Sequence, residues 1–243
     1  MKALILAGGR GKRLEGISDS QNKCMLMLKG KRLIEYSLEN AVSADVDEII
    51  IVVGYKAEDI INAYGINYNG KPVRYVIQWE QRGLVHAIEC SKDAIGDDDF
   101  MLFLGDEILV NSKHKQMLEL FEREGLFGTC GIVVVEDRSR ISKTYAIVQD
   151  GQDRIYRLIE KPKKPLNDLQ GTGNCIFRND ILSYIERTPI NQQRGEKELP
   201  DLIQCAIDEG NIVKSFVICD GYTNINSEED LREAELLFEL STD

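Results

Sequence analysis

The sequence predicts an α/β protein with a central mixed, mostly parallel sheet and helices on both of its faces. Short apolar, β-branched runs alternate with segments of helical periodicity through the first half of the chain. The composition is that of a globular protein, since 43% of the 243 residues are hydrophobic and 29% are charged. After residue 140 the alternation gives way to an antiparallel hairpin. We therefore expect one continuous sheet, not two separable domains.

The first half supplies the parallel strands. Strands are expected at 3–7, 48–55, 73–78, 100–106 and 129–137, and helices at 33–42, 57–63, 83–94 and 115–124. Ligands of such sheets bind at the carboxyl ends of the strands. A glycine-rich loop follows the first expected strand, and Asp106 ends the fourth. Both features therefore fall where a ligand is expected.

The second half begins with a hairpin, "YAIVQDGQDRIYRLIE", that turns near Asp150-Gly151. A strand is expected at 174–177, helices at 180–187 and 199–209, and a further strand at 212–218. The last helix begins after Ser227, where "SEED" supplies an N-cap and an acidic first turn. The single domain 1–243 thus divides into halves 1–137 and 138–243, which we expect to form two walls of a cleft.

Composition excludes several classes of function. The formal net charge of −11 argues against nonspecific nucleic-acid binding, which requires positive surface. No apolar run approaches the length of a membrane span. Six cysteines are scattered singly, without a Cys-x-x-Cys pair, so we expect reduced thiols and a cytoplasmic protein.

The stretch "LAGGRGKRL", Leu6 to Leu14, interleaves three glycines with Arg10, Lys12 and Arg13. Glycines allow the backbone N–H groups to approach a bulky ligand, and three cations suggest that the ligand is an anion such as a phosphate chain. The pattern is neither a Walker loop nor a complete dinucleotide fingerprint. A solvated surface turn therefore stays open as the alternative on this fragment alone.

Further motifs stand at the ends of expected elements. They are "QNKCMLMLKGKRLIEY", "QWEQRGLVHAI", "FLGDE", "EKP", "GTGN", "RGEKELPD" and "GYTNINSEEDL", in this order. The series resembles the sugar-phosphate nucleotidyltransferases, especially the thymidylyl- and uridylyltransferases that act on hexose 1-phosphates. The resemblance runs from Met1 to about Leu236. It implies the Rossmann-like three-layer fold of nucleotide-diphospho-sugar transferases, with a nucleotide-binding half followed by an acceptor-binding half.

The resemblance also assigns a nucleotide site. The expected nucleotide-binding residues are Leu6, Gly8, Gly9, Gly11, Arg13, Gln78, Gly83 and Asp106. Among these, Gln78 and Gly83 would read a pyrimidine base, and the glycines would offer backbone donors. Arg13, Lys23 and Lys161 would act as the catalytic cations on phosphates.

The acceptor and metal sites follow in the same way from the resemblance. The expected acceptor-binding residues are Ala146, Glu160, Lys161, Gly171 and Arg194. The cofactor would be Mg²⁺, held by Asp106 and Asn224.

This chain departs from the family pattern at four positions. Asn22 replaces the usual proline before the loop lysine, which we expect to be a harmless change. Glu107 replaces the asparagine of the common "GDN" and would add negative charge beside the metal. Ala146 replaces a glycine near the sugar, and Asn224 replaces a second metal-binding aspartate. These changes leave the acceptor's identity more open than the class of nucleotide.

Each assigned residue also has a purely structural interpretation. Lys23 and Lys161 are of a type common on surfaces, and Asp106 could cap a helix. Gln78 could satisfy a sheet edge. Glu160 could form a local ion pair with Lys161, which is worth little at a surface.

The residue inventory agrees with the implied reaction. A phosphate monoester is already an anion near neutral pH because its second pKa is about 6, so the attack needs no general base. The chain contains only two histidines, His86 and His114.

The expected substrates are dTTP or UTP and a sugar 1-phosphate, by default glucose 1-phosphate. The alternatives are another hexose, a heptose or a non-sugar phosphate, with CTP as a further nucleotide, or a regulatory protein that only binds nucleotide sugars. A homo-oligomer, dimer or tetramer, is also expected.

Overall fold

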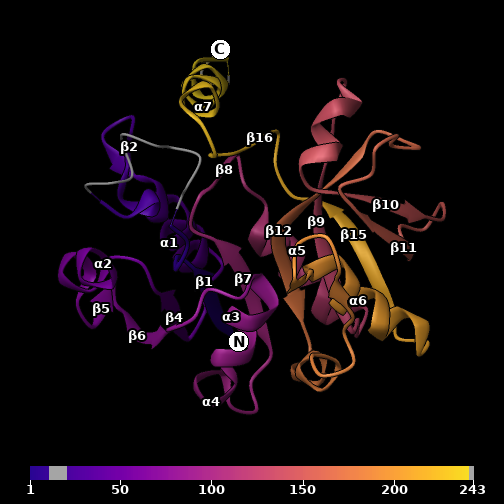
Figure 1. The fold of residues 1–243 in the computed structure, drawn as a ribbon, viewed down its shortest axis with the longest axis horizontal. Helices are drawn as coiled ribbons and strands as arrows, with labels where there is room; N and C mark the ends of the chain where they lie inside the picture. Colours follow the sequence, from indigo (N-terminus) through magenta and orange to yellow (C-terminus); the bar gives the residue numbers. More distant parts are fainter. Residues whose placement is uncertain (11–20, 241–243) are drawn as a thin grey trace.

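In the computed structural model of the protein, residues 1–10 and 21–240 are described. Among them, ten strands form one mixed sheet whose main path runs β11-β10-β12-β7-β1-β4-β6-β5, with β9 pairing β12 and β15 (Figure 1). The strands of the sheet are β1 (Lys2–Leu6), β4 (Glu48–Val53), β5 (Asn67–Tyr68), β6 (Lys71–Ile77), β7 (Phe100–Leu104), β9 (Gly128–Val134), β10 (Tyr145–Gln149), β11 (Ile155–Glu160), β12 (Leu169–Phe177) and β15 (Val213–Val217). The sheet thus contains strands from both halves of the chain.

Helices cover both faces of the sheet. The α-helices are α1 (Leu33–Ser43), α2 (Ala57–Tyr64), α3 (Leu84–Cys90), α4 (Lys92–Ile95), α5 (His114–Arg123), α6 (Leu199–Asp208) and α7 (Glu228–Leu240). Three 3-10 helices accompany them, η1 (Lys23–Met25), η2 (Arg138–Lys143) and η3 (Asn179–Tyr184). Two predicted helices need correction: 83–94 divides at Ser91 into α3 and α4, and 180–187 forms η3, which is a 3-10 helix.

The central strands are buried on both faces, and this explains their continuous apolar sequences. β1 lies between β4 and β7 and runs parallel to both. Ala3 and Ile5 belong to the core on one face, with residues of α1 and α5, whereas Leu4 belongs to the core on the other face, with α3 and α6. A strand covered on both sides loses the alternation of apolar and polar residues.

The second half joins the sheet through the antiparallel strand β12 and through β15, which runs parallel to β9. β10 and β11 form the predicted hairpin, and β12 runs antiparallel to both β7 and β9. β12 is longer than the predicted strand 174–177, because it begins at Leu169 and includes the "GTGN" motif. Its pairing with β9 shifts register between Gly171 and Cys175. A bulge of this kind re-aims the backbone beside a site.

Several short strands outside the main sheet complete the fold. β8 (Glu107–Val110) pairs with β16 (Gly221–Asn224), β2 (Met27–Leu28) with β3 (Lys31–Arg32), and β13 (Ile190–Asn191) with β14 (Glu196–Lys197). α7 lies over β8 and β16 at the top of the view in Figure 1. A small third core forms there, which includes Leu28, Tyr36, Ile108, Ile225 and Ala234.

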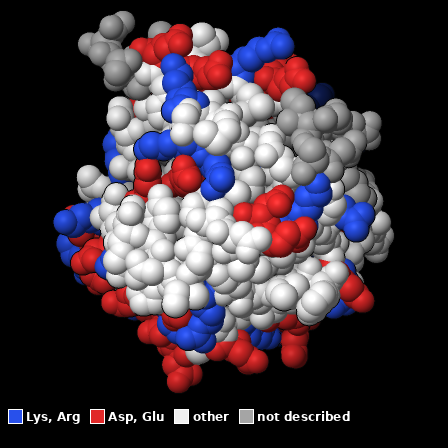
Figure 2. Space-filling model, turned by 90° about the vertical axis from the view of Figure 1, so that its left-hand side faces the viewer, with Lys and Arg blue, Asp and Glu red and all other residues white. Residues whose placement is uncertain are grey.

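Surface charge is interspersed on the face that Figure 2 shows, where acidic and basic side chains surround an uncharged area. The described part of this face carries no continuous basic stripe. None of the described helices has both the length and the apolar character that a membrane crossing requires.

Candidate functional site

A cleft of about 490 Å³ opens at the carboxyl ends of the parallel strands. Its walls come from the turn after β1, the segment between β6 and α3, the end of β7, and the β13–β14 region. The predicted residues that line it are Leu6, Gly8, Gly9, Gln78, Gly83, Asp106 and Arg194. Gly11 and Arg13 lie outside the described residues.

The turn after β1 packs closely against the turn after β4. Ala7 donates its N–H to Val52 O at 2.8 Å, and Tyr55 donates its N–H to Gly8 O at 3.2 Å. A Cβ atom placed on Gly54 would lie 2.7 Å from Gly8 O. Glycine at position 54 therefore permits the approach of the two turns.

Asn22 holds the returning end of this loop in place. Its buried side chain donates to Ala7 O at 3.1 Å and to Tyr55 O at 2.7 Å, and its Oδ1 accepts from Cys24 N at 2.8 Å. From the sequence we expect Asn22 to be a harmless replacement for proline. In the structure Asn22 caps η1, and its side chain also donates hydrogen bonds to the turns that follow β1 and β4.

Lys23 forms an ion pair with Asp106, which lines the cleft. Their side chains are only 10% and 20% exposed, so the pair is not an ordinary surface contact. Lys23 Nζ also donates to Ile225 O at 2.7 Å. The lysine that begins η1 thus connects the end of β7 to the segment before α7.

Gln78 and Gly83 face each other across the side of the cleft. Gln78 Nε2 donates to Gly83 O at 3.1 Å and contacts His86 Nδ1 at 3.0 Å. Gly83 has φ of +91°, and a Cβ there would overlap the side chain of Glu196. Gly83 is therefore a point where the first half of the chain closely approaches β14.

A second cavity of about 230 Å³ adjoins the first. Both cavities are lined by Leu84, Leu104, Arg194 and Glu196. The predicted residues in the second lining are Glu160, Lys161, Gly171, Arg194 and Asn224. Ala146 is buried on β10 and lies outside the linings of both cavities.

Charged side chains gather on one wall of the second cavity. Glu160 Oε1 lies 3.2 Å from Lys161 Nζ and 3.3 Å from an Arg194 guanidinium nitrogen. Arg194 Nε also lies 3.2 Å from Glu198 Oε1. Burial raises the pKa of the Glu160 carboxyl, against the opposing effect of Lys161 and Arg194. Burial likewise raises the pKa of Glu198, and the charge of Glu160 adds to this shift.

Lys161 lines this cavity directly after β11. Lys161 follows β11 with φ of +42°, and its N–H donates to Thr144 O at 2.7 Å. On β12, which pairs with β10, a Cβ at Gly171 would overlap the ring of Tyr145. The glycine thus leaves room for Tyr145, whose hydroxyl donates to Thr172 O at 2.8 Å.

Glu107 corrects one expectation from the sequence. Its buried carboxylate accepts hydrogen bonds from Gly173 N at 3.0 Å, Asn174 Nδ2 at 2.7 Å and the Tyr222 hydroxyl at 2.6 Å. Burial raises the pKa of Glu107 to about 7. The carboxylate is therefore enclosed by β12 and β16, and it does not stand as an added full charge beside Asp106.

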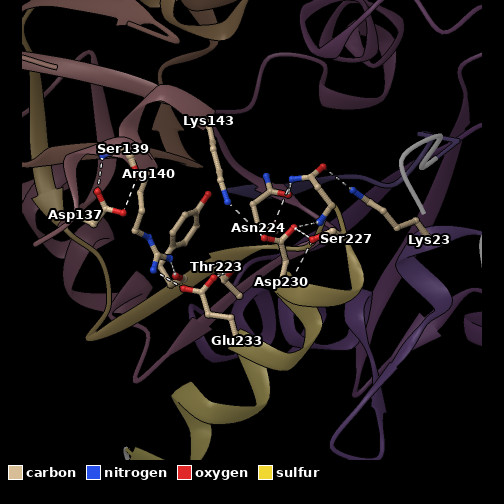
Figure 3. Close-up of polar contacts among 12 residues, drawn as sticks. Lys23, Asp137, Ser139, Arg140, Lys143, Thr223, Asn224, Ser227, Asp230 and Glu233 are labelled. Atoms are coloured by element: carbon tan, nitrogen blue, oxygen red, sulfur yellow. Dashed lines mark hydrogen bonds and ion pairs between the residues drawn. The ribbon is translucent and has the colours of Figure 1, made fainter. Parts of the chain in front are cut away.

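Asn224 lies at the end of β16, close to Lys143 and Asp230 in Figure 3. Its Oδ1 accepts a hydrogen bond from Asn226 Nδ2 at 2.9 Å. Asn226 Oδ1 in turn accepts from Lys23 Nζ at 3.5 Å. Asn226 thus connects Asn224 to Lys23 through hydrogen bonds.

Four residues of the site were not predicted from the sequence. Lys143, Glu196 and Glu198 line the second cavity, and Asn226 contacts both Lys23 and Asn224. The "GEKE" sequence carried a signal for two of them, because residues two apart on an extended segment share one face. Lys143 and Asn226 had no comparable local signal.

A divalent cation fits the donor chemistry at Asp106. The described residues contain no cluster of three or more His, Cys, Asp and Glu side chains that could hold a metal. Mg²⁺ often binds to one or two carboxylates, with waters and substrate phosphates completing its shell. Asp106 already faces a cation, the Lys23 ammonium. The residues present therefore suit a metal that arrives with phosphates.

Comparison with known proteins agrees with this geometry. Residues 2–236 match the family model described as nucleotidyl transferase. The chain therefore belongs to the nucleotidyl transferase family, as the sequence resemblance predicted.

Two relatives come from the archaeon Haloferax volcanii. One, a low-salt glycan biosynthesis nucleotidyltransferase called Agl11, is 34% identical over 98% of this chain and 66% of its own length. The other, UTP–glucose-1-phosphate uridylyltransferase AglF, is 33% identical over 97% of this chain and 95% of its own length. A glucose-1-phosphate thymidylyltransferase from Streptomyces griseus is 31% identical over 98% and 66%. The chain thus spans slightly less than two thirds of Agl11 and of the Streptomyces protein, and nearly all of AglF.

The fold has close counterparts among solved structures. A UDP-glucose pyrophosphorylase solved with UDP-glucose superposes with a TM-score of 0.89, at 22% identity, over 99% of this chain and 98% of that one. This likeness confirms the predicted Rossmann-like α/β fold with a mixed, mostly parallel sheet.

Proposed function

We propose that this protein transfers a nucleotidyl group from a pyrimidine nucleoside triphosphate to a sugar 1-phosphate, with release of pyrophosphate. The observation that carries the proposal is the pair of adjoining cavities. The first has the glycine turn and Asp106, and the second has Glu160, Lys161 and Arg194. Two anionic substrates placed in these cavities would meet at the shared wall.

The chemistry requires in-line attack and charge stabilisation. An oxygen of the acceptor phosphate attacks the α-phosphorus, a new P–O bond forms, and the bond to the leaving pyrophosphate breaks. Neither histidine is needed as a base. His114 is buried and its pKa is lowered to about 4 by burial, and His86 contacts Gln78 on the cleft wall.

We assign the cationic roles as follows. Lys23 would leave Asp106 and hold phosphate oxygens of the nucleotide, together with Arg13. Lys161 and Arg194 would hold the acceptor phosphate, and Glu160 would accept hydrogen bonds from sugar hydroxyls once the cations turn to the phosphate. Preorganised cations of this kind stabilise the charge that develops in the transition state.

Asp106 would hold Mg²⁺ beside the phosphates. When bound, Mg²⁺ supplies positive charge that neutralises the phosphate oxygens. In this structure the same carboxylate pairs with Lys23. We therefore expect metal and nucleotide to bind together, because both act on this ion pair.

A pyrimidine base is favoured at the side of the cleft. Gln78 Nε2 is engaged with Gly83 O and His86 Nδ1, which leaves the Oε1 acceptor to meet the imide N–H of uracil or thymine. The names of AglF and of the Streptomyces relative support UTP or dTTP, with glucose 1-phosphate as the acceptor to test first. Packing alone separates such similar nucleotides by about 10- to 200-fold.

A pyrophosphate-release screen tests the proposal. The five triphosphates dTTP, UTP, CTP, ATP and GTP are combined with a panel of sugar phosphates and Mg²⁺. We expect turnover with dTTP or UTP, loss of turnover in Asp106→Asn, and unchanged turnover in Lys115→Ala, whose exposed lysine lies on α5. Absence of turnover with every pair, or a clear preference for a purine nucleotide, would contradict it.

A further inference from the structure

The acceptor cavity contains a cation that the proposed function does not yet use. Lys143 ends η2 and lines this cavity together with Thr144 and Asn224. Its side chain is 71% exposed, and its Nζ lies 3.7 Å from Asp230 Oδ1. In Figure 3 the Lys143 side chain extends toward Asn224 and Asp230. The ammonium therefore lies between Asn224 of β16 and Asp230 in the first turn of α7.

The ion pair of Lys143 is looser than those of the other cations in the cavity. Lys161 and Arg194 lie 3.2 and 3.3 Å from Glu160, and Arg194 also contacts Glu198. The 3.7 Å separation of Lys143 from Asp230 exceeds ordinary hydrogen-bond distance. An anion that binds Lys143 would therefore break a weaker ion pair than an anion that binds Lys161 or Arg194.

Asp230 lies in the first turn of α7 and is held by the segment that precedes this helix. Its Oδ2 accepts hydrogen bonds from Asn226 N at 2.8 Å and from the Ser227 hydroxyl at 2.9 Å. These contacts fix the carboxylate in place at the start of the helix. Lys143 can thus turn toward a ligand while Asp230 stays where it is.

A chain of hydrogen bonds fixes the orientation of the Asn224 amide. Lys23 Nζ can only donate, so the Asn226 atom that it contacts is the acceptor Oδ1. Asn226 Nδ2 then donates to the Asn224 carbonyl oxygen at 3.3 Å and to Asn224 Oδ1 at 2.9 Å. Asn224 Oδ1 is therefore the atom that contacts Asn226, and Nδ2 is the hydrogen-bond donor that this side chain can offer to a ligand.

The second cavity is lined by acidic as well as basic side chains. The acidic residues that line it are Glu107, Glu160, Glu196 and Glu198, and the basic residues are Lys143, Lys161 and Arg194. A carboxylate at position 224 would add a further acidic group to this lining. An asparagine there offers N–H donors instead.

We propose that Lys143 and Asn224 form an anion-binding subsite for the phosphate group of the acceptor. The ammonium of Lys143 and the amide N–H groups of Asn224 bind phosphate oxygens at the part of the cavity that η2 and β16 line. This role for Asn224 differs from the metal-ligand role that the sequence resemblance implies. The inference rests on the proposed function, because it assumes a phosphorylated acceptor in this cavity.

Direct binding tests the subsite without turnover. Calorimetry measures the affinity of the nucleotide-free protein for inorganic phosphate and for glucose 1-phosphate. We expect Lys143→Ala to weaken both by about tenfold, since charge-assisted hydrogen bonds contribute this much. Lys143→Arg should restore most of the affinity. Lys115→Ala is the matched control and should bind as the wild type does.

The Asn224→Asp variant separates the two roles of position 224. As part of an anion subsite, the new carboxylate repels phosphate, and the affinity for phosphate falls by about tenfold or more. As a metal ligand, it would leave phosphate affinity unchanged and tighten Mg²⁺ binding in the same calorimeter. The latter result would overturn the inference, as would wild-type phosphate affinity in Lys143→Ala or absence of phosphate binding by the wild type.

Kinetics distinguish this inference from the proposed function. With an active substrate pair, Lys143→Ala should raise the KM for the sugar phosphate and leave the KM for the nucleotide unchanged. An unchanged KM for the sugar phosphate would contradict the subsite alone. If the wild type turns over no pair, the proposed function fails, and the phosphate-binding result still decides whether the subsite exists.

Discussion

Lys23 joins segments that lie far apart in the sequence. It pairs with Asp106, donates to Ile225 O, and contacts Asn226 through a side chain that is only 10% exposed. We predict that Lys23→Ala lowers kcat/KM by at least about 10²-fold, because a preorganised cation on the transferred phosphate is lost. Steady-state kinetics with the active substrate pair measures this.

Lys31→Ala is the comparison for that variant. Lys31 lies near Lys23 in sequence, but its partner is Glu39 and both side chains are more than a third exposed. Exposed pairs of this kind contribute little, so kcat/KM should stay near the wild-type value. Near-normal turnover in Lys23→Ala would refute the phosphate role of this lysine.

At the residue scale, the sequence predicts positions better than it predicts contacts. The positions of Gly8, Gly9 and Asp106 in the cleft were predictable because these residues follow apolar strands. Glu107 follows Asp106 directly, yet its carboxylate is enclosed by residues more than 60 positions away. Asn22 likewise bonds to strand ends that only the fold brings together. No local pattern encodes such partners.

The bulged strand β12 provides the prediction at the scale of an element. Gly171 pairs with Tyr145 of β10, and a Cβ on it would overlap the Tyr145 ring. Tyr145 is 4% exposed and cannot move into solvent without breaking its hydrogen bond to Thr172 O. We predict that Gly171→Ala lowers the free energy of unfolding by about 1–3 kcal/mol, the usual range for overpacking. Urea denaturation measures the loss.

Gly151→Ala controls for the general effect of replacing a glycine. Gly151 lies in the β10–β11 turn, and a Cβ there would meet nothing within 4 Å. Its unfolding free energy should change by no more than about 0.5 kcal/mol, as at most surface sites. Equal stability of the two variants would show that Tyr145 relaxes freely around the new methyl group.

The elements themselves were predictable to different degrees. β1, β4 and β7 are buried on both faces, and their continuous apolar runs identify them without any knowledge of their neighbours. The short strands β8 and β16 have only four residues each and are specified by pairing across more than 100 positions. Such pairing leaves no periodic signal in either segment.

At the scale of the whole molecule, a buried polar network connects the two halves. Glu107 of β8 accepts from Gly173 and Asn174 of β12 and from Tyr222 of β16. Asn174 gives its Nδ2 to Glu107, so its Oδ1 must accept from His114 Nε2, at 2.8 Å. The network thus joins the second half of the chain to the strand that directly follows Asp106.

The network makes stability depend on pH in a calculable direction. Burial raises the pKa of Glu107 from 4.5 to about 7. Between these values the folded protein keeps a proton that the unfolded chain has released, so raising the pH favours unfolding. The contribution is fully present below about pH 4.5 and is lost by about pH 7. One pKa unit corresponds to about 1.4 kcal/mol, so the loss is on the order of 3 kcal/mol.

His114 opposes this dependence, and a substitution is therefore needed to isolate Glu107. Burial lowers the pKa of His114 from 6.5 to about 4, so its contribution is lost as the pH falls through that range. We predict that the stability difference between the wild type and Glu107→Gln shrinks as the pH rises from 4.5 to 7, because glutamine cannot titrate. Urea denaturation of both proteins at half-unit pH steps measures the difference. Parallel curves would show that Glu107 is already ionised in the folded protein, since a carboxylate with an ordinary pKa contributes no slope above about pH 5.5.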